Sequence, residues 1–139
     1  MQRDIKFRGW DERSKIMHND LNFIRSGCNG DDWIVFVSDK NKLNSLPHPL
    51  DNPYFSQQIK IMQFTGLKDK SGVEIYEGDI VKTYNCKSHL EVIFRNACFC
   101  IKTASGGISD LYELAPVSMQ AIEVIGNIYE NPELLKSPD

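Results

Sequence analysis

Residues 59–82 read IKIMQFTGLKDKSGVEIYEGDIVK, and this central block decides the fold class. Its first part is rich in β-branched, aromatic and other large apolar residues, which is typical of a half-buried strand, and the run ends at Thr65-Gly66. Asp69-Lys70-Ser71-Gly72 predicts a turn, because aspartate accepts hydrogen bonds from the backbone ahead of it and glycine adopts positive φ. A second turn, Glu77-Gly78-Asp79, introduces a strand that begins at Ile80. The block therefore predicts part of a small barrel or meander.

The same alternation of short apolar runs and polar turns extends through the rest of the chain. Leu90, Val92 and Phe94 fall on one face of a strand, whereas Glu91 and Arg95 fall on the other. Asn131, followed by proline at the first helical position, predicts a short terminal helix with Asn131 as its N-cap. Further strands are expected at residues 5–10, 16–17, 21–24, 33–37, 80–84, 98–103, 108–114 and 122–129. The sequence thus predicts an all-β, mainly antiparallel fold with a short C-terminal helix.

The domain organisation follows from a polar, proline-marked stretch at residues 38–56. Pro47, Pro49 and Pro53 each lack a backbone donor, so this stretch is interpreted as a connection between two lobes. We expect an N-terminal β-meander lobe with this connector at residues 1–58 and a barrel-like C-terminal lobe at residues 59–139. One continuous domain over residues 1–139 is the alternative.

Composition limits the classes of protein to consider. With 41% hydrophobic and 25% charged residues, the chain is typical of a soluble globular protein. No apolar run approaches the ~20 residues that span a bilayer, so we expect a cytoplasmic protein without membrane contact. The net charge of −3 disfavours a general coat protein for duplex DNA, because such proteins need a positive field.

Three blocks of the sequence together resemble the YopX family, whose members are small proteins carried mostly by bacteriophages and prophages of Gram-positive bacteria. The blocks are residues 5–11 (IKFRGWD), the central block, and residues 124–135 (VIGNIYENPELL). At Gly9 the family more often has alanine. The resemblance implies an all-β fold and a phage origin, hence the cytoplasm of a bacterial host cell. It implies no established active site.

A zinc site is one alternative that the residue types leave open. Cys86, His89, Cys98 and Cys100 supply three thiols and one imidazole, which tetrahedral zinc prefers. Residues 98 and 100 lie on one face of a strand, and residues 86 and 89 lie in the preceding loop. The simpler interpretation is that the cysteines are reduced thiols that pack as small apolar residues. No catalytic residue and no cofactor are expected.

Two hypotheses of function remain. The first is a non-enzymatic accessory protein that acts through contacts with an unknown host or phage protein and self-associates through strand edges. The second is a nucleic-acid-binding module in phage replication or gene control. Its candidate contacts are Lys60, Lys68, Lys70 and Lys82, although interspersed carboxylates also make these lysines typical of a solvated strand face.

Overall fold

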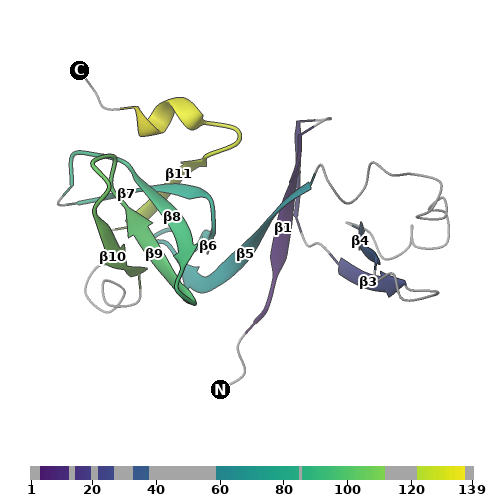
Figure 1. The fold of residues 1–139 in the computed structure, drawn as a ribbon. Helices are drawn as coiled ribbons and strands as arrows, with labels where there is room; N and C mark the ends of the chain where they lie inside the picture. Colours follow the sequence, from purple (N-terminus) through teal and green to yellow (C-terminus); the bar gives the residue numbers. More distant parts are fainter. Residues whose placement is uncertain are drawn as a thin grey trace. The chain divides into compact units, whose positions relative to one another are not determined.

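The computed structural model describes residues 4–12, 15–19, 22–26, 33–37, 59–84, 86–111 and 122–136 (Figure 1). Within these residues the secondary structure consists of antiparallel β-strands, the 3-10 helix η3 (Pro132–Leu135), turns and a single helical residue, Leu111. The predicted all-β, mainly antiparallel fold is therefore confirmed. No helix among these residues is long and apolar enough to cross a membrane. The chain divides into two compact units, Ile5–Gln63 and Phe64–Asp139, the second of which includes Met1–Asp4. The predicted lobes 1–58 and 59–139 stay a prediction.

The unit Ile5–Gln63 contains two antiparallel arrangements. β1 (Phe7–Asp11) pairs with β2 (Ile16–His18) on one side and with the first half of β5 (Ile59–Lys68) on the other. β3 (Asn22–Ser26) pairs with β4 (Trp33–Val37) in a two-stranded sheet. These strands fall where the apolar runs of the sequence predict them. The predicted connector at residues 38–56 lies outside the described residues.

Register determines which side chains of the first sheet share a face. Arg8 lies opposite Met62, and Trp10 lies opposite Met17, so these four residues share one face. Trp10 and Met62 are buried. On the other face, Gly9 lies at the centre of β1, opposite His18 of β2 and Ile61 of β5.

The unit Phe64–Asp139 is built on a five-stranded antiparallel sheet with the order β10-β9-β8-β7-β11. Its strands are β7 (Asp79–Thr83), β8 (Leu90–Arg95), β9 (Cys98–Lys102), β10 (Ile108–Asp110) and β11 (Ile122–Asn127). The second half of β5 pairs separately with β6 (Glu74–Tyr76). Figure 1 shows the green strands curving around one another, as the predicted barrel-like lobe requires.

The core of this second unit comes from the inward-facing residues of the curved sheet. Its buried members are Ile75, Val81, Leu90, Val92, Phe99, Ile101, Leu111 and Ile122. The predicted alternation in β8 is confirmed, because Leu90 and Val92 are buried. Phe94 lies on the same face and is partly exposed, and its ring centroid is 5.0 Å from that of Phe99. Each fully buried aliphatic side chain contributes about 1.5–3 kcal/mol to folding.

The C-terminal helix is present, and Asn131 occupies its N-cap position, as predicted. η3 begins with Pro132, as expected, but the Asn131 side chain makes no capping hydrogen bond to it. Asn131 Oδ1 instead accepts a hydrogen bond from the backbone N–H of Asn127 at 3.4 Å. Asn131 is thus the N-cap residue by position, as predicted, and its side chain bonds to the end of β11.

Candidate functional site

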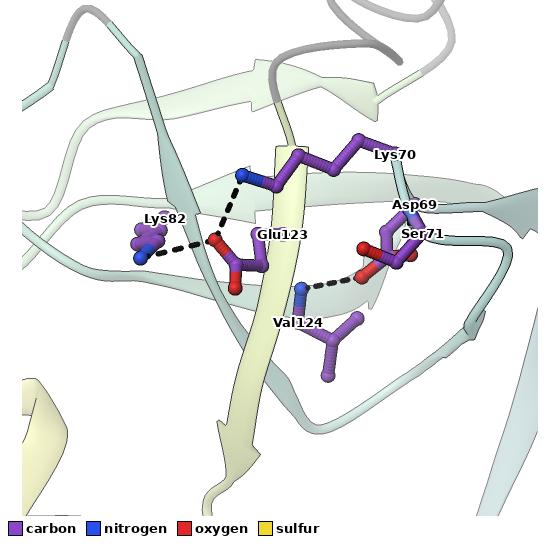
Figure 2. A network of polar contacts seen from close by, with 6 residues as sticks. All are labelled: Asp69, Lys70, Ser71, Lys82, Glu123 and Val124. Carbon is purple, nitrogen blue, oxygen red and sulfur yellow. Dashed lines mark hydrogen bonds and ion pairs between the residues drawn. The ribbon is translucent and has the colours of Figure 1, made fainter.

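The turn that follows β5 holds a network of polar contacts, which is drawn in Figure 2. Asp69 Oδ1 accepts hydrogen bonds from the backbone N–H of Ser71 at 2.8 Å and of Val73 at 2.9 Å. Gly72 has φ +83°, a conformation that residues with a side chain rarely adopt. The predicted roles of Asp69 and Gly72 in this turn are thus confirmed.

The same turn attaches to β11, which is far away in the sequence. Asp69 Oδ2 accepts a hydrogen bond from Val124 N at 3.0 Å (Figure 2). The backbone N–H of Lys70 donates to the carbonyl of Ile122, also at 3.0 Å. Burial raises the pKa of Asp69, but the hydrogen bonds from Val124, Val73 and Ser71 lower it more, so the net shift is downward. The turn therefore occupies part of the outer edge of β11.

Two of the four candidate lysines, Lys70 and Lys82, contact the same carboxylate, that of Glu123. Glu123 lies opposite Lys82 in the β7–β11 register, and its carboxylate contacts Lys82 Nζ at 3.0 Å and Lys70 Nζ at 3.1 Å (Figure 2). Hydrogen bonds from Lys82 and Lys70 lower the pKa of Glu123. Sequence reasoning missed Glu123, because only the pairing of β7 with β11 reveals it.

The other two candidate lysines do not extend this cluster. Lys68 lies opposite Glu74 at the end of the β5–β6 pair, and its side chain is exposed. Lys60 is also exposed, and it lies opposite Trp10 in the other unit of the chain. The structure therefore joins Lys70 and Lys82 through a shared carboxylate.

Two further polar residues of the central block are buried and structural. Asp79 is 1% exposed and accepts a hydrogen bond from the backbone N–H of Tyr76 at 2.7 Å, which closes the turn before β7. The Thr65 hydroxyl donates to the carbonyl of Ile75 at 2.7 Å and accepts from the backbone N–H of Leu67. Buried polar groups need such partners, so these residues stabilise the fold.

Of the four residues of the alternative zinc site, Cys98 and Cys100 lie close enough to interact, and each of the four also has other partners. Cys86 packs against the hydrophobic core, and Cys100 is buried. The Cys98 thiol donates to Asp110 Oδ2 at 3.1 Å, and this hydrogen bond, helped by burial, raises the pKa of Cys98 to about 11. His89 Nδ1 lies 2.7 Å from the carbonyl of Leu134. Among the residues that the structure describes, no group of three or more His, Cys, Asp or Glu side chains is placed to hold a metal ion.

A cleft of about 360 Å³ adjoins His89. Because a carbonyl oxygen accepts only, the 2.7 Å contact with Leu134 requires the proton on Nδ1, which leaves Nε2 as the acceptor of the neutral ring. The cleft is lined by Lys87, Ser88, His89, Ala104, Glu133, Leu134, Leu135 and Lys136. It combines basic, acidic and apolar groups and has no pair of acid and base arranged around a nucleophile.

Strand edges and exposed apolar side chains are the remaining surface features. In the sheet β2-β1-β5, Ile16 is 52% exposed and Ile61 is 41% exposed. The two isoleucines lie on the same face as Gly9, since Ile61 is opposite Gly9 and Ile16 is opposite Asp11. In the five-stranded sheet the edges are β10 and β11, and the Asp69 turn covers part of β11.

These features define a small antiparallel β protein in which the polar turns at Asp69 and Asp79 stabilise the fold. The family model described as YopX protein matches residues 6–136, and the chain belongs to the YopX family. The resemblance inferred from the three sequence blocks is thereby confirmed.

Two solved structures are similar to the chain. The crystal structure of protein EF1440 from Enterococcus faecalis is 29% identical with a TM-score of 0.63, over 97% of this chain and 100% of that one. The crystal structure of protein yopX from Bacillus subtilis is 24% identical with a TM-score of 0.54, over 94% and 98% of the two chains, and it bears on the fold alone. No curated protein matches the chain.

Proposed function

We propose that this YopX-family protein is a non-enzymatic phage accessory protein that binds other proteins through exposed strand edges, a second copy of itself among them. The observation on which the proposal depends is the three-stranded arrangement β2-β1-β5. Within the described residues, β1 is the pairing partner of β2 and of the first half of β5, and each of these two strands is paired on one side only. Strand edges of this kind accept a further strand through backbone hydrogen bonds.

Exposed apolar side chains beside these edges support the same proposal. Ile61 on β5 lies opposite Gly9 and Ile16 on β2 lies opposite Asp11, so the two exposed isoleucines share one face of this sheet. Covering such side chains stabilises an association by about 25 cal/mol for each Å² of apolar surface removed from water. Thr65, Asp69 and Asp79 of the central block, in contrast, use their side chains for hydrogen bonds within the fold.

Light scattering and sedimentation over a wide concentration range test the self-association. We expect the average mass to rise with concentration toward that of an oligomer. A monomer at all concentrations would remove self-association from the proposal. Capture of host proteins on the immobilised chain, competed by excess soluble chain, tests the binding of other partners.

Nucleic-acid binding stays a prediction and has less support from the geometry. Lys70 and Lys82 both contact Glu123, so their charges are partly neutralised where a phosphate would bind. Retention of labelled single- and double-stranded oligonucleotides at low salt, lost as salt rises, would favour this second function.

A further inference from the structure

The cleft of about 360 Å³ beside His89 lies between the loop that precedes β8 and η3, the yellow helix in Figure 1. His89 from the loop and Leu134 from η3 both line it, and the 2.7 Å contact between His89 Nδ1 and the Leu134 carbonyl joins these two walls. Small-molecule sites have volumes of about 300–1,000 Å³. The cleft therefore has the size of a site for a small organic molecule.

Hydrogen bonds hold the backbone of the cleft walls in place. In η3, the backbone N–H of Leu134 donates to the carbonyl of Asn131 at 3.1 Å. Ala104 lines the cleft from the turn that follows β9. In this turn the N–H of Thr103 donates to the carbonyl of Gly107 at 2.8 Å, and the N–H of Gly107 donates to Thr103 Oγ1 at 2.8 Å. The cleft is thus formed without a ligand, which limits the conformational entropy lost on binding.

The polar side chains around the cleft differ from those of the Asp69 turn in how they are used. In the part of the chain that the structure describes, Lys87 and Lys136 make no ion pair, and His89 Nε2 makes no hydrogen bond. Lys70 and Lys82, in contrast, share an ion-pair partner. Lys87 and Lys136 are exposed, and His89 is half-buried. These groups are therefore open to a ligand that enters from solvent.

We propose that this cleft binds a small organic acid that has an apolar body and an O–H or N–H donor. Lys87 and Lys136 attract the negative charge of the acid, and they outnumber the one carboxylate of the lining, that of Glu133. With its proton on Nδ1, the neutral His89 ring accepts at Nε2 and so selects the donor. The leucine and alanine side chains of the lining contact the apolar body. This inference goes beyond the proposed function and does not depend on strand edges.

An NMR titration of the isotope-labelled full chain tests the binding. The probes are the ortho, meta and para hydroxybenzoates, added at constant ionic strength. At least one isomer should shift the backbone amides of residues 87–89, 104 and 133–136 saturably, with a Kd on the order of 1 mM for so small a probe. Benzoate lacks the hydroxyl, the hydroxybenzamides lack the charge, and inorganic phosphate lacks the apolar body. Each of these comparison probes should bind less tightly than the best hydroxybenzoate.

Charge substitutions test the class of ligand. Lys87→Gln and Lys136→Gln should each raise the Kd of the best hydroxybenzoate about two- to fivefold, because each removes an attractive charge at an exposed site. Glu133→Gln should lower the Kd by a similar factor, because it removes a repelling charge. Lys68→Gln, at an exposed lysine that does not line the cleft, is the matched control and should leave the Kd unchanged. The amide spectrum of each variant establishes that it is folded.

His89→Phe tests the role of the ring nitrogen. The substitution retains an aromatic ring but removes Nε2, so the best hydroxybenzoate should lose its advantage over benzoate. The ratio of the two Kd values is the readout, because the lost contact with Leu134 affects both probes alike. A ratio equal to that of the unaltered chain would overturn the assignment of His89 as the acceptor.

Other results would overturn the inference as a whole. If none of the three isomers shifts the amides of the cleft saturably, the cleft is not a site for such acids. A comparison probe that binds as tightly as the best hydroxybenzoate removes the feature that this probe lacks. Equal weakening by Lys68→Gln and Lys87→Gln would indicate a general attraction of anions to surface lysines. None of these results bears on self-association, which light scattering measures separately.

Discussion

Asp69 and Val124 lie 55 positions apart in the sequence and are joined by a hydrogen bond of 3.0 Å between Asp69 Oδ2 and the Val124 backbone N–H. The other oxygen of the same carboxylate organises the Asp69 turn through Ser71 and Val73. One side chain therefore both shapes a local turn and fastens that turn to β11. The central and C-terminal blocks of the family resemblance meet at this point.

Replacement of Asp69 by alanine should destabilise the fold by about 2–4 kcal/mol, because three backbone N–H groups lose a charged acceptor. Urea unfolding followed by circular dichroism measures this change. Ser71→Ala is the matched control, since Ser71 contributes its backbone N–H to the bond with Asp69, and its effect should stay within about 0.5 kcal/mol. Equal stabilities of Asp69→Ala and Ser71→Ala would contradict the role of Asp69.

Acid should weaken the fold through Asp69 and Glu123. Hydrogen bonds outweigh burial at Asp69, and the contacts with Lys82 and Lys70 act at Glu123, so both folded-state pKa values lie below the ordinary 3.8 and 4.5. A lowered pKa stabilises the folded state above the ordinary pKa, and this stabilisation is lost as the pH falls through the folded-state value. Thermal unfolding between pH 7 and pH 3 should show a loss that begins near pH 4.5. Asp69→Asn should flatten the dependence of the unfolding temperature on pH. An unchanged slope would argue against a contribution of the Asp69 carboxylate.

Local patterns predicted most of the strands and the Asp69 turn, because period-two alternation and turn residues act over a few positions. The bond from Asp69 to Val124 and the meeting of two lysines at Glu123 were not predictable, since both depend on where β11 packs. The same limit applies to the predicted zinc ligands. Cys98 contacts Asp110 across the β9–β10 pair, a partner that ligand spacing did not suggest.

The hairpin between β8 and β9 should gain stability from glycine at Ala97. Asn96 has φ +52° and Ala97 has φ +59°, so both central residues occupy the left-handed region that a type I′ turn requires. Alanine is strained there, and Ala97→Gly should stabilise the fold by about 0.5–1 kcal/mol. Ala104→Gly, at an exposed turn position without positive φ, should have the opposite or no effect. Destabilisation by Ala97→Gly in urea unfolding would contradict the assigned turn strain.

A side chain at Gly126 should destabilise the end of β11. A Cβ atom there would lie 2.6 Å from Asn131 Oδ1 and 2.9 Å from its Cγ, which is too close for either atom. Gly126→Ala should therefore cost about 1–3 kcal/mol. In the Asn131→Ala background the two closest atoms are absent, so the cost of Gly126→Ala should be smaller. Additive effects in this double-mutant cycle would show that the clash with Asn131 is not the cause.

The Cys98 thiol should react slowly until Asp110 is replaced. The hydrogen bond to Asp110, followed by burial, raises the pKa of Cys98 from 9.0 to about 11, so little thiolate is present at pH 8. Asp110→Asn removes the negative charge and should accelerate alkylation of Cys98 at pH 8 about tenfold or more, measured by mass spectrometry of the modified peptide. Cys86 in the same samples is the internal reference, because its rate should be the same in both proteins. An equal acceleration at Cys86 would indicate general loosening of the fold, and an unchanged rate at Cys98 would remove Asp110 as the cause of its low reactivity.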